Sequence, residues 1–254
     1  MPSNSRHGML NRPISNFELR TYDQYIKSLN PYLWFKFNES SGTTVINYGS
    51  GGTGLNGTFT TGSGSVAQVG QFGLQSAYSF DGLSSGSKVN VPNNSAYSNA
   101  SAFTVVALLN PTGSGLSNTG TVYEFDNGNN KMLYSASASL FHMRRPTSTT
   151  NPQIITNSGQ VPINGVWQFI IGKYNDTTDR KVHVYRGYKN RLIEFTYGTN
   201  TTGTGTLSSE SNSLNIGNNS TSAQTWSGLF GNFLWFNRDV PLYQLMTIIK
   251  LAKV

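Results

Sequence analysis

Residues 165–186, GVWQFIIGKYNDTTDRKVHVYR, constrain the fold of this chain most, because they hold two β-type runs joined by a polar turn. Apolar side chains occupy both alternating faces of the first run, with Trp167, Phe169 and Ile171 on one face and Val166, Ile170 and Tyr174 on the other. A strand of this kind is covered on both sides. The return run alternates Val182 and Val184 with Lys181, His183 and Tyr185, as a half-buried antiparallel strand does. The segment therefore predicts the central hairpin of a β-sandwich.

The composition excludes several kinds of site. The 254 residues include no cysteine, which removes disulfides, thiolate metal sites and cysteine nucleophiles. Lysine and arginine outnumber aspartate and glutamate by 18 to 11, giving a net charge of +7, yet only 11% of the residues are charged. A nucleic-acid binder concentrates basic residues into a stripe with aromatic residues between them, and this chain has only local clusters. We expect one all-β domain, a class in which lengths of roughly 200 to 250 residues are common, with no nucleic-acid partner.

The first 30 residues differ from the rest. Residues 1–15 form a polar arm that carries Arg6 and Arg12, and we expect a partner subunit to order it, with packing on its own domain as the alternative. A Ser-x-x-Glu capping box then begins a helix over residues 16–29, whose apolar side chains recur at helical spacing: Phe17, Tyr22, Tyr25 and Ile26. This helix is either a plug for the open end of the sandwich or a docking element. No apolar run has the length of a signal-peptide core or the ~20 residues that span a bilayer, so we expect neither ordinary export nor membrane insertion.

From Pro31 onward, short β-type runs alternate with glycine-rich turns. The expected strands cover residues 32–37, 77–80, 88–91, 102–109, 121–125, 132–136, 140–144, 153–156, 192–197, 213–216 and 229–236, in addition to the hairpin. Such spacing is typical of a sandwich or jelly roll. Residues 199–212 read as an exposed loop, and an apolar stripe after Pro241 predicts a closing helix: Leu242, Leu245, Met246 and Ile249. We therefore divide the chain into a docking segment, residues 1–30, and a β-domain, residues 31–254.

The order of motifs over residues 31–252 resembles the laminin-G-like branch of the concanavalin A-like lectin/glucanase superfamily. The motifs are LWFKF followed by ESSG at residues 39–42, YSFDG at 78–82, VNVP at 89–92, AFTV at 102–105, GVW at 165–167, YND at 174–176, LNIG at 214–217, FG at 230–231 and FNR at 236–238. The resemblance implies an all-β, two-sheet antiparallel jelly-roll sandwich with a short helix at each end, and loops that bind glycans or other ligands, in some members with calcium. Two features depart from it: Ala107 and Leu108 stand where a tryptophan often follows, and the arm before Pro31 lies outside the family.

A glucanase-type hydrolase is the enzymatic alternative. Retaining glycosidases need two carboxyl groups about 5 to 5.5 Å apart. Glu124 and Asp126 begin the pattern of acids that such enzymes carry on one strand face, but Asn127, Gly128 and Asn129 supply no second glutamate. The chain has only three histidines, and no Gly-x-Ser-x-Gly elbow precedes an expected helix. We therefore expect no catalytic residues and no enzymatic activity.

Three binding chemistries remain. Calcium needs six to eight converging oxygens, for which the turns offer Asp81, Asp176 and Asp179, although turn aspartates more often bond to their own backbone. We expect no other cofactor. Glycans would contact loop aromatics and amides, and the candidates are Tyr48, Tyr97, Trp226, Asn93, Asn94, Asn218 and Asn219. A basic rim, Arg180, Lys181, Arg186, Lys189 and Arg191, could meet an acidic neighbour or an anionic polysaccharide.

We interpret the chain as a non-enzymatic structural protein of a virion, made in the host cytoplasm and displayed on the surface of a phage or other virus as a decoration or fibre-like subunit. Residues 1–30 would attach it to capsid or other virion subunits, within a larger assembly or homo-oligomer, and the sandwich would present a glycan-binding face to the host surface. The alternative is a free or cell-surface lectin-like module in an extracellular location.

Overall fold

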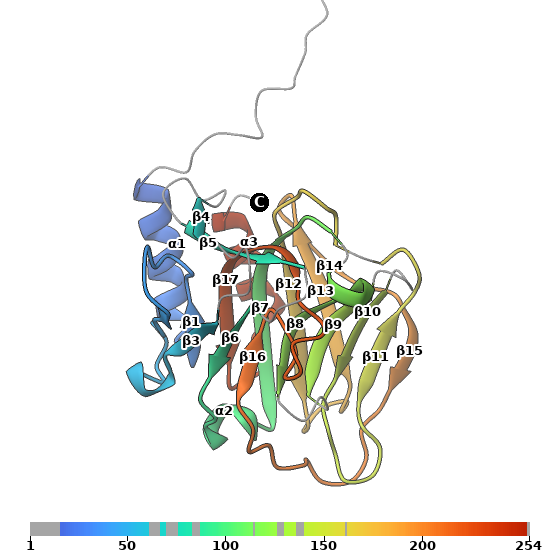
Figure 1. The fold of residues 1–254 in the computed structure, drawn as a ribbon. Coiled ribbons are helices and arrows are strands. Elements are labelled where there is room, and N and C mark those ends of the chain that lie inside the picture. The colour runs from blue at the N-terminus through green and yellow to red at the C-terminus, as the bar shows by residue number, and fades with distance from the viewer. Residues whose placement is uncertain are drawn as a thin grey trace, which may run out of the picture.

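A computed structural model describes residues 16–60, 67–69, 76–82, 87–113, 115–125, 130–135, 140–160 and 162–252, without the side chains of 16–20, 67–69, 76, 81 and 117. Most of the elements are β-strands, and they form two antiparallel sheets (Figure 1). The fold class expected from the sequence is confirmed: an antiparallel two-sheet sandwich with a short helix near each end. None of the helices in the described part of the chain has the length and apolar character needed to cross a membrane.

The first sheet contains the hairpin that organises the sequence. Its order is β14 (Arg191–Glu194), β13 (Val182–Tyr188), β12 (Gln168–Asn175), β7 (Ala102–Pro111), β17 (Ser227–Phe236), β5 (Ser76–Asp81) and β4 (Ala67–Val69), and β1 (Leu33–Phe35) also pairs with β17. Tyr174 pairs with Val182 and Phe169 with Gly187 across the hairpin. The predicted hairpin is therefore confirmed in place, and the structure supplies its register.

The second sheet covers the other side of the core. Its order is β15 (Tyr197–Thr201), β11 (Gln153–Thr156), β10 (Leu140–Arg144), β9 (Lys131–Ser135), β8 (Thr119–Phe125), β16 (Leu214–Ile216), β6 (Lys88–Val91), β3 (Gly57–Thr60) and β2 (Thr44–Val45). Short helices lie in the connections: η1 (Thr53–Leu55), α2 (Ser95–Ser98) and η2 (Leu116–Asn118). Residues 192–197, expected as one strand, divide between β14 and β15 in different sheets, and β15 occupies the start of the expected loop 199–212.

The apolar side chains form two cores because the first sheet is apolar on both faces. The inner core lies between the sheets and includes Val105, Ile170, Val184 and Trp235. Alternate residues of the same strands, such as Val106 and Ile171, enter a second core on the outer face of the first sheet. The strands that contribute to both cores are the nearly continuous apolar runs of the sequence, as expected for doubly covered strands.

Two helices cover that outer face: α1 (Asn16–Ser28) and α3 (Leu242–Ala252). Tyr22 and Ile26 of α1 are buried in the outer core together with Ile248 and Ile249 of α3. Arg238 joins the helices, since its Nη2 donates to the carbonyl of Leu29 at 2.9 Å. Helix α1 therefore lies on a sheet face instead of plugging the open end of the sandwich. The apolar stripe of α3 is also rotated from the expected one, because Leu242 is exposed and Ile248 is buried.

Candidate functional site

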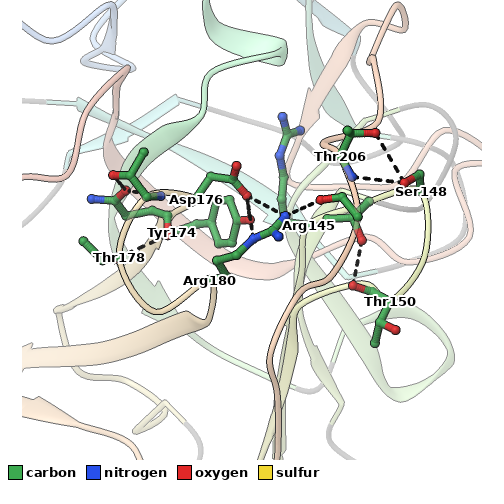
Figure 2. A network of polar contacts seen from close by, with 12 residues as sticks. Arg145, Ser148, Thr150, Tyr174, Asp176, Thr178, Arg180 and Thr206 are labelled. Atoms are coloured by element: carbon green, nitrogen blue, oxygen red, sulfur yellow. Dashed lines mark hydrogen bonds and ion pairs between the residues drawn. The ribbon is translucent and has the colours of Figure 1, made fainter.

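The turn between β12 and β13 holds a network of polar contacts that includes Asp176 (Figure 2). Tyr174 donates its hydroxyl to Asp176 Oδ1 at 2.7 Å, and Arg180 donates Nε to the same oxygen at 3.0 Å. Arg180 Nη2 lies 2.9 Å from it as well. Burial and the hydrogen bond to Asp176 raise the pKa of Tyr174 to about 12, so this hydroxyl stays a donor at neutral pH. Asn175 closes the turn by accepting from the amide of Thr177 at 3.0 Å.

Neighbouring loops hold the turn from outside. Arg180 donates to the carbonyl of Gly205 and accepts from the amide of Gly203 through its own carbonyl. The 203–206 segment in turn contacts the β10–β11 loop, since the amide of Thr206 donates to Ser148 Oγ at 3.1 Å (Figure 2). Three loops far apart in the sequence therefore meet at one end of the sandwich.

Arg145 lies under this loop cluster and is 1% exposed. Its Nη1 donates to the carbonyl of Ser98 at 2.9 Å, and its guanidinium lies 6.0 Å from the ring centre of Phe103. Burial lowers the pKa of Arg145, while Tyr123, Tyr174, Glu210 and Asp176 favour its charge. Arg145 is therefore a buried residue that stabilises the loops around it and is not exposed to a ligand.

A hollow of about 330 Å³ opens beside the same turn, on the outer face of the first sheet where α3 begins. Its lining is polar and aromatic: Lys173, Tyr174, Asn175, Thr178, Asp179, His183, Tyr185 and Asp239. The strand register brings the lining together, because Lys173 pairs with His183 across the hairpin. The sequence prediction included Asp179 of this set but missed Lys173, Tyr185 and Asp239. A signal was present in the sequence for Lys173, since this lysine interrupts a strand face that otherwise carries Trp167, Phe169 and Ile171.

Charged pairs fix the walls of the hollow. Lys173 Nζ lies 2.6 Å from Asp239 Oδ1. His183 lies between two carboxylates, with Nε2 2.8 Å from Asp179 Oδ2 and Nδ1 2.6 Å from Glu194 Oε1. Burial lowers the pKa of His183, but the hydrogen bonds with Glu194 and Asp179 outweigh burial and raise the pKa above its ordinary value. In Asp179 burial raises the pKa, and the bonds with His183 and the Lys181 amide outweigh it, so the net shift is downward.

This arrangement is suited to binding hydroxyl groups. The carboxylates of Asp179 and Asp239 stay accessible, at 47% and 37% side-chain exposure, while their partners hold them in place. Tyr185 is 9% exposed and belongs to the outer core; it stacks on His183 with the ring centres 6.4 Å apart, and only part of its ring lines the hollow. A glycosidase acid needs a raised carboxyl pKa, whereas that of Asp179 is lowered. The geometry therefore favours ligand binding over acid catalysis.

Two of the aromatic residues predicted to contact glycans are buried, and for them the prediction is wrong. Tyr97 is 0% exposed and donates its hydroxyl to the carbonyl of Pro92, and Trp226 is 1% exposed against Phe230. Both rings fill the inner core, because the segments that carry them fold back over its ends. Tyr48 is exposed, packing edge-on against Trp34 with the Lys36 ammonium 4.7 Å from its ring centre. Tyr48 therefore stays a candidate, away from the turn and beside α1.

The predicted asparagines bond to the protein's own backbone, three of them locally and Asn93 to a distant loop. Asn218 accepts from the amides of Asn219 and Gln224, and Asn219 accepts from that of Ala223, so both stabilise the 217–225 turn. Asn94 is the N-cap of α2, accepting from the amide of Ala96 at 2.9 Å. Asn93 donates to the carbonyl of Glu210 at 3.5 Å. Burial of Asn218 and Asn219 makes the prediction of direct ligand contact wrong for these two.

The turn acids do not converge on a cation site. Asp176 faces Arg180 and Tyr174, and Asp179 faces His183. No cluster of three or more potential metal ligands occurs among the residues that the structure describes. The side chain of Asp81, the third acid of the calcium prediction, lies outside the described residues, although its backbone ends β5.

The predicted docking residues have different outcomes. Tyr22 and Ile26 are buried within the molecule's own outer core, so the prediction that they contact a partner is wrong. Tyr25 is half-buried, and its hydroxyl lies 3.5 Å from the carbonyl of Gln244 in α3. Arg6, Arg12 and the side chain of Phe17 lie outside the described residues, and the division of the chain at residue 30 stays a prediction.

Only part of the predicted basic rim is exposed for contact with another molecule. Arg180 is bound to Asp176 and Gly205, and Arg186 lies 5.9 Å from the ring centre of Phe195. Lys181 is partly exposed. Lys189 and Arg191 are exposed at the β13–β14 turn. The rim therefore divides into internal contacts and one exposed cationic corner.

The acidic strand pattern at Glu124 lies on the second sheet. Glu124 is 4% exposed and faces Lys131 and Asn215 in register, while Asp126 lies outside the described residues. Within the described part of this face, the in-register neighbours of Glu124 are therefore an ammonium and an amide instead of a second carboxylate. The expectation of no catalysis stays a prediction.

Comparisons with known proteins bear on the fold. No family model and no curated protein matches the sequence. Among solved structures, the binding domain of Paraclostridial Mosquitocidal Protein 1 is similar with a TM-score of 0.60 and 13% identity, over 87% of this chain and 52% of that one. The binding domain of botulinum neurotoxin serotype D gives a TM-score of 0.60 and 12% identity, over 87% of this chain and 51% of that one. Domain 4 of AbnA, an extracellular GH43 arabinanase from Geobacillus stearothermophilus, was solved in complex with arabinotriose. It gives a TM-score of 0.57 and 15% identity, over 88% of this chain and 98% of that domain.

The chain shares its β-sandwich fold with these binding domains. It spans about half of the length of the two toxin domains and nearly all of the arabinanase domain. At these identities the likeness concerns the fold alone.

Proposed function

We propose that this protein is a non-enzymatic glycan-binding module whose ligand occupies the hollow beside the β12–β13 turn. The observation that carries the proposal is the lining itself: two accessible carboxylates, an ammonium group and an aromatic ring converge on one cavity. Carboxylates and ammonium groups bond to sugar hydroxyls, and the part of the Tyr185 ring that lines the hollow adds apolar surface. The sandwich fold supports the proposal, because one similar domain holds arabinotriose.

Each lining residue has a role in this proposal. Asp179 and Asp239 accept hydrogen bonds from neighbouring hydroxyls, and Lys173 donates to a ring or hydroxyl oxygen. The ion pairs of these residues hold them in place before the ligand arrives, which reduces the entropy cost of binding. Asp176, Arg180 and Arg145 stay behind the turn and keep it in one conformation.

A glycan array probed with the full chain tests the function, and titration of the best ligand with two variants tests the site. Asp239→Asn alters the hollow, whereas Asp23→Asn alters a similar pair elsewhere, since Asp23 also contacts a lysine, Lys36, at 2.6 Å. We expect Asp239→Asn to weaken binding by about tenfold or more and Asp23→Asn to leave it unchanged. An array without a bound sugar contradicts the function, and equal affinity of both variants contradicts the location.

Display on a virus particle is the finer part of the proposal. With Tyr22 and Ile26 buried, attachment would rest on residues 1–15, where Arg6 and Arg12 are the cationic candidates. Deleting residues 1–15 should then abolish incorporation into particles while the domain stays folded. Incorporation at the normal level would contradict attachment through this segment, whereas absence of the full chain from particles would favour the free extracellular lectin-like module.

A further inference from the structure

Glu194 lies just behind the hollow, on the far side of His183 from Asp179. It is the last residue of β14, and Tyr185 is its partner in register across the strand pair. Glu194 Oε1 accepts the hydroxyl of Tyr197 at 2.7 Å and lies 2.6 Å from His183 Nδ1. Tyr185 also forms a hydrogen bond with this carboxylate. Two tyrosines therefore hold Glu194 against the histidine.

Tyr197 ties this carboxylate to the second sheet. It begins β15, which belongs to the second sheet, whereas β14 belongs to the first. The Tyr197 hydroxyl accepts from the amide of Val184 at 2.9 Å, and it donates to Glu194 at 2.7 Å in preference to the Val184 carbonyl at 3.5 Å. Burial and the bond with Glu194 raise the pKa of Tyr197, so the hydroxyl stays a donor at neutral pH. Glu194 is thus less free to turn away than Asp179, which lies on an exposed turn.

His183 cannot donate to both of its carboxylate partners once it is neutral. The imidazolium has two N–H groups and bonds to Glu194 and Asp179 at once, whereas the neutral ring has only one. Because the tyrosines hold Glu194 in place, the remaining proton stays on Nδ1. Nε2 then turns its lone pair to Asp179 Oδ2, 2.8 Å away, and the two acceptors repel. Asp179 keeps the bond from the Lys181 amide to Oδ1, but it loses the contact that fixes Oδ2 beside the hollow.

Other charged groups lie around His183 on β12, on the turn and before α3: Lys173, Asp176, Arg180, Lys181 and Asp239. Lys173 is opposite His183 in register, but its ammonium is paired with Asp239. Asp176 and Arg180 are paired with each other. Glu194 and Asp179 are thus the groups in direct contact with the imidazole.

We propose that Glu194 and Tyr197 are positioning residues that keep the proton of neutral His183 on Nδ1, so that Asp179 is held beside the hollow only while His183 is charged. The consequence for binding rests on the proposed function: the hollow binds a neutral sugar more tightly when His183 is charged than when it is neutral. The reason is that a carboxylate already held in place loses less conformational freedom when it accepts a ligand hydroxyl.

NMR of the free chain tests the positioning. Nitrogen chemical shifts of the imidazole report which atom carries the proton, and the carboxyl carbon of Asp179 reports its contact with His183. In the unmodified chain, neutral His183 should carry its proton on Nδ1, and the Asp179 signal should change with the same midpoint as His183. Glu194→Gln replaces the carboxylate by an amide that can donate to Nδ1, so the proton should move to Nε2 and the contact with Asp179 should persist. The Asp179 signal should then change much less across the titration.

Glu39→Gln is the matched control, since Glu39 also accepts a tyrosine hydroxyl, that of Tyr78 at 3.1 Å, but lies elsewhere in the fold. It should leave the position of the proton unchanged. Tyr197→Phe should shift part of the population to the Nε2 form, because it frees Glu194. Circular dichroism verifies that the variants are folded. A proton on Nε2 in the unmodified chain, or equal effects of Glu194→Gln and the control, overturns the proposal.

Titration with arabinotriose, about one pH unit below and one above the His183 midpoint measured in the unmodified chain, tests the consequence for binding. Both values lie above the lowered pKa of Asp179. The unmodified chain should bind at least about threefold more tightly at the lower pH, and the affinity of Glu194→Gln should change by less than about twofold. Equal affinity of the unmodified chain at both values overturns the link to binding. Absence of arabinotriose binding at both values contradicts the proposed function for this sugar, and the proton position in the free chain still decides the role of Glu194 and Tyr197.

Discussion

Truncation of Ile26 to alanine tests whether α1 belongs to the folded body of this protein. Ile26 is 0% exposed and lies in the outer core with Tyr22, Leu29 and the buried face of α3. Its side chain lies between two helices and a sheet, where the surroundings cannot collapse easily into the space left behind. If α1 were a separate docking segment, its removal would not change the stability of the sandwich.

The expected cost follows from the burial. Replacing a fully buried isoleucine by alanine removes three methyl or methylene groups and leaves a cavity, which typically destabilises a protein by about 2 to 5 kcal/mol. For a domain of this size, each kcal/mol lowers the melting temperature by roughly 2 to 4 °C. Ile26→Ala should therefore melt about 4 to 20 °C below the unmodified protein.

Thermal unfolding followed by circular dichroism, with urea unfolding as a second measure, provides the assay. Gln24→Ala is the matched control, since Gln24 lies in the same helix on its exposed side. The control should change stability by less than about 0.5 kcal/mol. If Ile26→Ala unfolds at the same temperature as the control, the outer core does not stabilise the sandwich, and α1 is the independent docking element that the sequence also allowed.

The remaining predictions concern the turn. Because the folded-state pKa of His183 is raised, its contribution to stability is complete below its unfolded pKa near 6.5 and is lost as the pH rises through the folded value. Asp179 behaves in the opposite sense: its contribution is present above about 3.8 and is lost as the pH falls through its lowered pKa. The ion pairs around His183 should thus be strongest between these limits, and NMR titration should show that Glu194→Gln lowers the His183 pKa; an unchanged pKa would contradict the contact. Calcium added after EDTA treatment should leave the melting temperature unchanged, because Arg180, Tyr174 and His183 already face Asp176 and Asp179. A calcium-dependent rise would show a cation site that includes groups outside the described residues.

The candidate site was harder to predict than the fold, for a physical reason. Turn aspartates, loop aromatics and asparagines are alike in sequence whether they meet a ligand or bond to their own backbone. The sequence predicts both Tyr97 and Asn218 as ligand contacts. In the structure the Tyr97 ring is buried in the inner core, and the buried Asn218 side chain accepts a backbone hydrogen bond within its own turn. Asp239 is far from the hairpin in sequence, and only the meeting of β17, α3 and β12 brings it to Lys173.

The sequence by itself determined the hairpin and the class of fold, because alternation of apolar side chains with period two is a local property. Val182, Val184 and Tyr185 enter the faces that their positions predict. Tertiary structure alone decided where α1 packs, which polar residues stay exposed, and that Asp239 meets Lys173. These outcomes depend on contacts between segments distant in the chain, and no local pattern of side chains encodes such distances.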